Sequence, residues 1–263
     1  MVKSAERAAT LIKLLADHPN GLLFSDIEKR LALPKSSLHD LLDTLVATHL
    51  ACYDTDTKCY RLGPLVWEAA MAFSRNLQLV PLALPHLDRL SRTLGETVQM
   101  AVRDGADIVY IAKSESRHPV QLISSVGSRL PAHATGLGKA LLACLSDHHL
   151  DQLYPNLTSL PALSPHTISD LSALKVDLDR TRMRGYAIDA GECTPGLTCL
   201  ATPILDGHHK PVAAISVSIP HDRYATHNPS AMAEDLRKEA NALARTLGAS
   251  DPGSWQRQEN APF

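Results

Sequence analysis

The sequence has no long hydrophobic run and no apolar leader segment. No stretch approaches the roughly 20 consecutive apolar residues that a membrane-spanning helix requires. The N-terminal residues Met1 to Arg7 include charged side chains and no apolar segment of the secretory type. We therefore expect a cytoplasmic protein with no membrane partner.

Cysteines are few and odd in number. The chain contains five, namely Cys52, Cys59, Cys144, Cys193 and Cys199. A disulfide framework needs a denser, even set in a short secreted domain, so we predict reduced thiols. The spacing of Cys144 and His148 suits zinc, but the second half of a zinc site is missing. We expect no metal and no cofactor.

The chain also has no excess of charge. Its net charge is -2 and its isoelectric point is about 6.7, so there is no global attraction to nucleic acid. Hydrophobic residues make up 44% and the mean hydropathy is -0.08, which is typical of a globular chain. A length of 263 residues suits one large domain or two modest ones. Composition alone does not indicate DNA binding; the order of the local patterns does.

The first fifty residues have the pattern of three short helices. Apolar residues within 4–16 share one helical face, and Pro19-Asn20-Gly21 then predicts a turn. Ser25 and Glu28 fit a capping box, so we predict that the second helix begins at Ser25 and ends at Leu33-Pro34. The third helix follows, with an inward face formed by Leu38, Leu41, Leu42 and Leu45.

A β-hairpin is predicted next. Residues 50–53 and 59–62 read as strands on either side of the polar loop 54–58. Three helices, the second and third joined by a tight turn, followed by a hairpin are the pattern of a winged helix-turn-helix.

This motif predicts DNA contacts on the third helix and on the wing. A helix fits the major groove, with its N-terminal residues against phosphates and base edges. The predicted contacts are Lys35, Ser36, Ser37, His39, Lys58 and Arg61. The same side chains also fit an ordinary solvated surface. Acidic and basic residues balance within 1–62, so one domain should bind weakly and a dimer would double the contacts.

The rest of the chain predicts a connecting helix and an α+β domain. A helix is expected at 65–77; Pro81 and Pro85 should interrupt the chain before another helical stretch at 87–94. The alternating and apolar runs then predict a mainly antiparallel sheet combined with helices. The expected strands are 98–102, 108–112, 119–124, 186–188, 199–205 and 211–219, and the expected helices are 138–145, 147–153, 167–184 and 229–247.

Four separated motifs in this region resemble the isocitrate-lyase-regulator (IclR) family of bacterial transcription factors. They are residues 127–143 (GSRLPAHATGLGKALLA), 184–192, 196–204 and 213–220. With Pro34-Lys35-Ser36-Ser37, the resemblance extends from about residue 4 to residue 248. It implies a winged helix-turn-helix domain (1–63), a linker helix (64–79), a GAF-like effector-binding domain (80–249) and a C-terminal tail (250–263). It also implies a homodimer or homotetramer that represses or activates a catabolic operon.

The resemblance further implies the positions of an effector pocket. Carried over by motif, these are Leu130, Gly136, Leu137, Asp189, Leu197, Cys199, Ser216 and Ser218. Ser216 and Ser218 would point the same way from one strand, as a receptor for a carboxylate requires. Each position also has a purely structural alternative. The two serines could face solvent from their strand, and Gly136 could serve only the geometry of its loop. Asp189 could be a turn residue, and the leucines could belong to the hydrophobic core. Ile219 stands where the family commonly has glycine, and we expect it to narrow the pocket mouth.

These patterns favour a ligand-responsive bacterial transcriptional regulator that binds operator DNA and a small organic acid, either a carboxylate or an aromatic acid. The alternative is a small-molecule hydrolase or ligand sensor whose N-terminal module serves assembly only. No nucleophile–base spacing supports an enzyme. Gly136 to Lys139 resembles the end of a P-loop, but His133 and Ala140 stand where that motif needs glycine and Ser or Thr.

Overall fold

The computed structural model describes residues 2–77, 79–116, 124–155 and 159–249. The chain divides into two compact units, residues 1–78 and 79–263, and the helix at 64–77 falls in the first. Within the described residues, no helix is both long and apolar enough to cross a membrane.

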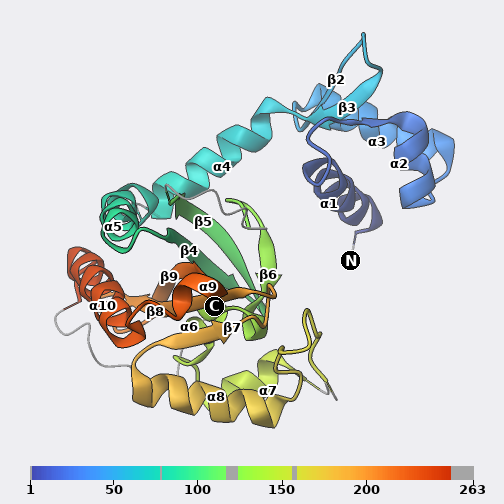
Figure 1. The fold of residues 1–263 in the computed structure, drawn as a ribbon. Coiled ribbons are helices and arrows are strands. Elements are labelled where there is room, and N and C mark those ends of the chain that lie inside the picture. Colours follow the sequence, from blue (N-terminus) through green and yellow to red (C-terminus); the bar gives the residue numbers. More distant parts are fainter. Residues whose placement is uncertain (1, 78, 117–123, 156–158, 250–263) are drawn as a thin grey trace. The chain divides into compact units, whose positions relative to one another are not determined.

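The first unit is a winged helix-turn-helix, which confirms the expectation from the sequence. Its helices and strands are α1 (Lys3–Ala16), β1 (Leu22–Leu23), α2 (Phe24–Leu31), α3 (Lys35–Ala47), β2 (Ala51–Tyr53), β3 (Cys59–Leu62) and α4 (Pro64–Leu77). The hairpin β2–β3 is antiparallel and forms the wing (Figure 1). Leu11, Ile27, Leu38 and Leu42 are fully buried, so the three helices share one core.

The predicted capping box of the second helix is wrong. Helix α2 begins at Phe24, with Leu23 at the N-cap and no side-chain cap bond. The reason is a strand that the sequence pattern did not reveal. Leu22 and Leu23 pair with Tyr60 and Cys59 as β1, so the chain passes from strand to helix before it reaches Ser25.

The predicted interruption at two prolines is also wrong. A single helix, α5 (Leu79–Leu94), contains both Pro81 and Pro85. Pro81 lies in the first turn, where the missing backbone N–H costs little. Pro85 lies inside the helix, and burial of the apolar face that includes Ala83 and Leu87 outweighs the lost hydrogen bond.

The second unit is built on a six-stranded antiparallel sheet with the order β6-β5-β4-β9-β8-β7. The strands are β4 (Thr97–Asp104), β5 (Asp107–Ser114), β6 (Arg129–Pro131), β7 (Ala187–Ala190), β8 (Leu197–Leu205) and β9 (Pro211–Pro220). Five of them agree with the predicted strands. The sixth, β6, was not predicted, and most of the strand expected at 119–124 lies outside the described residues.

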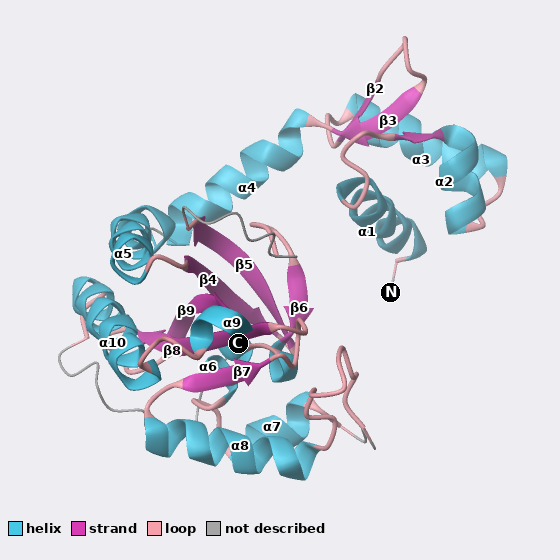
Figure 2. Cartoon of the chain, viewed as in Figure 1, coloured by secondary structure: helices cyan, strands magenta, loops and turns pink. Residues whose placement is uncertain are grey.

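Helices cover both faces of this sheet (Figure 2). Helices α5 and α10 pack together on one face, and α6 packs on the other, with α8 on its outer side. The remaining elements are η1 (Ala132–Ala134), α6 (Gly136–Leu142), α7 (Asp147–Leu153), α8 (Leu171–Arg184), α9 (His221–Tyr224) and α10 (Pro229–Thr246). The predicted α+β architecture with a mainly antiparallel sheet is therefore confirmed.

Helix α6 lies unusually deep, because all seven of its residues are buried. Its approach to the preceding turn leaves no room for a side chain at Gly138. A Cβ atom there would lie 2.1 Å from the carbonyl oxygen of Ala132, closer than any real contact. A Cβ at Gly136 would meet the Cβ of Cys199 at 3.4 Å, an ordinary contact.

These distances predict different outcomes for two alanine substitutions on α6. Gly138→Ala should lower the free energy of unfolding by about 2–3 kcal/mol or more, because backbone must move to accept the methyl group. Gly136→Ala, the matched control, should cost less than about 1 kcal/mol. Urea unfolding curves of the two variants provide the measurement. Equal midpoints would contradict the close approach of α6.

Candidate functional site

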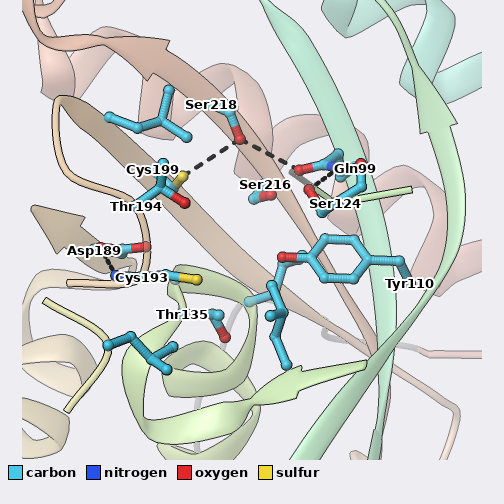
Figure 3. A pocket seen from close by; sticks show the side chains of 15 residues that line it. Gln99, Tyr110, Ser124, Thr135, Asp189, Cys193, Thr194, Cys199, Ser216 and Ser218 are labelled. Carbon is cyan, nitrogen blue, oxygen red and sulfur yellow. Dashed lines mark hydrogen bonds between the residues drawn. The ribbon is translucent and has the colours of Figure 1, made fainter. Parts of the chain in front are cut away.

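A cavity lies between the N-terminal end of α6 and the sheet. It has a volume of about 220 Å³. The residues that line it come from all six strands of the sheet, from α6 and from four loop segments (Figure 3). The lining residues are Gln99, Tyr110, Ser124, Leu130, Thr135, Gly136, Leu137, Leu163, Asp189, Cys193, Thr194, Leu197, Cys199, Ser216 and Ser218.

Strand register places the polar lining residues side by side. Asp189 pairs with Cys199 across β7 and β8, and Cys199 pairs with Ser218 across β8 and β9. Ser216 pairs with Gln99 on β4. Because side chains alternate along a strand, residues in register point to the same face. These residues therefore form a continuous polar strip beneath α6.

Hydrogen bonds connect this strip along one wall. Cys199 Sγ lies 3.3 Å from Ser218 Oγ, and Ser218 Oγ lies 3.4 Å from Gln99 Oε1. The Gln99 Nε2 donates to Ser124 Oγ at 2.8 Å. On the facing wall the Tyr110 hydroxyl points into the cavity (Figure 3). The cavity thus offers several hydroxyl and amide groups within a small volume.

The recognition helix of the first unit presents polar residues at its N-terminus. Lys35 and Ser36 are exposed and Ser37 is half-buried at the start of α3. His39 is exposed and lies against Phe24, with ring centroids 4.8 Å apart. The leucine face of α3 is buried, so these four side chains lie on the opposite, accessible face.

The two predicted wing residues differ in their surroundings. Lys58 is exposed at the hairpin loop and has a positive φ of 57°. Arg61 on β3 is held within its own unit, 3.3 Å from Asp54 Oδ2 and 3.3 Å from the carbonyl oxygen of Asn20. Backbone amides of Thr57 and Asp56 lower the pKa of Asp54, so it remains an anionic partner for Arg61.

Comparison with known families agrees with both units. Residues 4–54 match the IclR helix-turn-helix domain, and residues 71–245 match the C-terminal domain of bacterial transcriptional regulators of the IclR type. Together these matches cover most of the chain. The chain belongs to the IclR family.

Individual IclR relatives match over nearly the whole length. The HTH-type transcriptional repressor AllR of Salmonella typhi is 34% identical over 250 residues, which cover 95% of this chain and 92% of AllR. The HTH-type transcriptional regulator BhcR of Paracoccus denitrificans is 33% identical, over 92% of this chain and 86% of BhcR. The protein is therefore a transcriptional regulator with a helix-turn-helix DNA-binding domain and a C-terminal effector domain.

A solved IclR structure shows the same architecture. It is an IclR homologue from Microbacterium hydrocarbonoxydans complexed with 4-hydroxybenzoate. The two chains superpose with a TM-score of 0.82 at 27% identity, over 93% of this chain and 98% of that one.

All eight residues that the IclR resemblance implied for the effector pocket line the cavity. Sequence reasoning missed seven others, namely Gln99, Tyr110, Ser124, Thr135, Leu163, Cys193 and Thr194. Gln99 had a usable signal, because it is a polar residue between the buried Val98 and Met100. Ile219 was expected to narrow the mouth, but it is fully buried and is not among the lining residues.

Among the described lining residues, the side chains do not include the usual bases of nucleophilic catalysis. No histidine, lysine or arginine is among the described lining residues. Burial raises the pKa of the Cys193 thiol to about 11 and raises that of Cys199 as well. Both thiols are therefore protonated at neutral pH, and a thiol is a poor nucleophile. The described residues also contain no cluster of three or more histidine, cysteine or acidic side chains that could hold a metal.

Asp189 is the acidic residue of the cavity. It is 3% exposed, and its Oδ1 accepts hydrogen bonds from the backbone N–H of Glu192 at 2.6 Å and of Cys193 at 3.4 Å. Burial is the largest influence on the carboxyl group and raises its pKa to about 7. The sequence left open whether Asp189 is a turn residue or a pocket residue. It is both, because it accepts the N–H bonds of its turn and also lines the cavity.

A buried ion pair supports the cavity from behind. Lys139 on α6 is 1% exposed; its Nζ lies 2.5 Å from Glu192 Oε1 and 3.0 Å from Asp177 Oδ2 on α8. Glu192 belongs to the same turn as Asp189, and Thr167 Oγ1 donates to the Glu192 carbonyl at 2.6 Å. Lys139 therefore joins α6, α8 and the turn that contains Asp189. It lies in the segment that resembles the end of a P-loop in sequence.

Removal of Lys139 should be costly. Lys139→Met leaves two largely buried carboxylates without their cation, and we expect a loss of about 3–5 kcal/mol in the free energy of unfolding. Lys175→Met is the matched control, because Lys175 forms a more exposed pair with Asp151 at 2.6 Å and should contribute less than about 1 kcal/mol. Urea unfolding of both variants measures the difference, and similar losses would show that the buried pair is not special.

Proposed function

We propose that the chain is a ligand-responsive bacterial regulator that binds a small carboxylic or aromatic acid in the cavity beneath α6. The observation that carries this proposal is the convergence of the eight implied residues on one cavity. The proposal also assigns operator DNA to the N-terminal end of α3 and to the wing, and control of an operon for breakdown of the acid.

The size of the cavity supports a compact effector. An engineered apolar cavity of about 150 Å³ holds benzene. The volume of about 220 Å³ found here suits a molecule slightly larger than benzene, such as a short-chain acid or a single-ring aromatic acid.

The chemistry of the walls supports an oxygen-rich effector. Hydroxyl groups of Tyr110, Ser216 and Ser218 and the amide of Gln99 can donate to carboxylate or phenol oxygens. Leu130, Leu137 and Leu197 provide apolar walls for a ring or short carbon chain. The Microbacterium homologue holds 4-hydroxybenzoate, which combines these features.

A thermal-shift screen with small organic acids, 4-hydroxybenzoate and short 2-oxo acids included, tests the effector assignment. At a hundredfold excess over Kd, binding stabilises the native state by about 2.7 kcal/mol, which corresponds to a Tm increase of roughly 5–10 °C. The double variant Ser216→Ala/Ser218→Ala should lose most of this increase because two hydroxyl donors are removed.

The control for this screen is Ser172→Ala, an exposed serine on α8. It should show the same shift as the unmodified chain. A shift that survives in the double variant would place the effector elsewhere, and the absence of any shift would contradict an acid as the effector.

Operator binding is tested by selection from a pool of random DNA duplexes, followed by binding assays with the recovered sequence. The variant Lys35→Ala/Ser36→Ala/Ser37→Ala should bind at least about tenfold more weakly and show a smaller salt dependence, because a phosphate contact is lost. Lys238→Ala removes an exposed lysine from α10 in the other unit and should bind normally. Equal binding by both variants would contradict the assignment of α3.

The proposed regulator works as a homodimer or homotetramer. Two copies of α3 would read two half-sites, which compensates for the balanced charge of a single domain. Helix α4, which joins the two units in sequence, is the proposed linker. An effector alters DNA binding only if it binds one arrangement of the subunits more tightly than another.

A further inference from the structure

One oxygen of the Asp189 carboxyl group is unused by the protein. Oδ1 accepts the two backbone N–H bonds of its own turn, whereas Oδ2 has no hydrogen-bond partner among the described residues. Figure 3 shows the carboxyl group directed toward the cavity. Because the carboxyl group lines the cavity, a molecule bound there can contact this oxygen.

The charges around Asp189 do not hold it in the ionised form. Lys139 on α6 acts to lower the pKa of Asp189, but Lys139 itself pairs with Glu192 and Asp177. Glu192 in turn disfavours a negative charge on Asp189.

The other titratable groups that face Asp189 carry no positive charge that would stabilise its ionised form. The thiols of Cys193 on the same turn and Cys199 on β8 and the phenol of Tyr110 on β5 all have a raised pKa, so they are neutral near pH 7. Their own shifts include repulsion from the Asp189 charge. The site therefore lets Asp189 carry a proton within the neutral range, where an ordinary aspartate is ionised.

We propose that a carboxylate effector is held through a proton shared with Asp189, so that effector and proton occupy the cavity together. This inference rests on the proposed function. The Asp189 O–H donates to a carboxylate oxygen of the effector, and no covalent bond to carbon changes. When Asp189 is ionised before binding, the proton comes from solvent. Two ionised carboxylates in contact would repel each other strongly in this buried site, whereas one shared proton converts repulsion into a hydrogen bond.

A pH dependence of affinity follows. Below pH 7 Asp189 already carries the proton, so the Kd of an ionised acid stays constant. Above pH 7 one proton must be taken up with each acid, and the Kd should increase about tenfold for each pH unit. An uncharged amide of the same shape does not need the proton and should show no such increase.

The first arm of the test needs no ligand. Full-length protein with ¹³C-labelled aspartate carboxyl groups is titrated by NMR, and the Asp189→Asn variant identifies the Asp189 signal by its loss. We expect a titration midpoint near pH 7. A midpoint below about pH 5 contradicts the constant Kd expected below pH 7, because Asp189 would then be ionised throughout the neutral range and the Kd would already increase between pH 5 and pH 7.

The second arm measures binding by calorimetry at pH 6, 7 and 8 in two buffers with different ionisation enthalpies. The probes are 4-hydroxybenzoate, 4-hydroxybenzamide and each acid that raises the Tm. Proton uptake per bound acid should increase toward one at pH 8 in the unmodified chain and in the exposed control Asp151→Asn, and should disappear in Asp189→Asn.

The outcomes separate this inference from the proposed function. Acids that bind with pH-independent Kd and no proton uptake overturn the shared proton and leave the effector pocket in place. If no acid binds at any pH, the acid effector and this inference are both wrong.

Discussion

The second unit depends on how closely α6 approaches the sheet and the turn before it. Because position 138 has no side chain, α6 can lie against the backbone of Ala132 and bury all its residues, Lys139 included. A buried ammonium group costs several kcal/mol unless it is paired. Glu192 and Asp177 supply that pairing, and the Glu192 turn carries Asp189. The close approach of one helix therefore determines which loop must fold against it, and it places an acidic side chain at the end of the cavity.

The cavity is a consequence of small polar residues beneath this helix. Protein interiors are close-packed, and an empty apolar void of 220 Å³ would cost about 5 kcal/mol. Cys199, Ser216 and Ser218 leave this space open where leucine or valine would fill it. Their polar atoms, together with Gln99 and Tyr110, can form hydrogen bonds with water or a ligand, which an apolar void could not. The same residues that leave the core incompletely filled supply polar groups to the cavity wall.

Much of this could be predicted from the sequence. The leucine spacing of α3 and the strand order of the second unit follow from periodicity, and the positions of Asp189 and Ser216 followed from motifs. The features that were missed or predicted wrongly depend on contacts between residues that lie far apart in the sequence. β1 has two residues and no periodicity, and it exists because Leu22 and Leu23 pair with β3. The prolines of α5 are tolerated because its other face is buried. The ion pair of Lys139 joins residues 53 positions apart, which no local pattern reveals. Gln99 reaches the cavity through the register between β4 and β9.

The turn and the cavity do not by themselves explain why residue 189 is an acid. Asparagine has almost the same shape, could accept the same two backbone N–H bonds through its carbonyl oxygen, and would carry no charge into a buried site. An aspartate whose pKa is raised to about 7 destabilises the folded state above pH 4, because the folded protein then binds a proton that the unfolded chain releases. The hydrogen bonds of the turn alone do not require an aspartate, so they do not explain this loss of stability. An ionisable group there fits the proposed acid effector, which its proton or its charge would contact in the cavity. Stability at neutral pH is thus reduced at a position that lines the cavity, where the proposed effector would gain a charge-dependent contact.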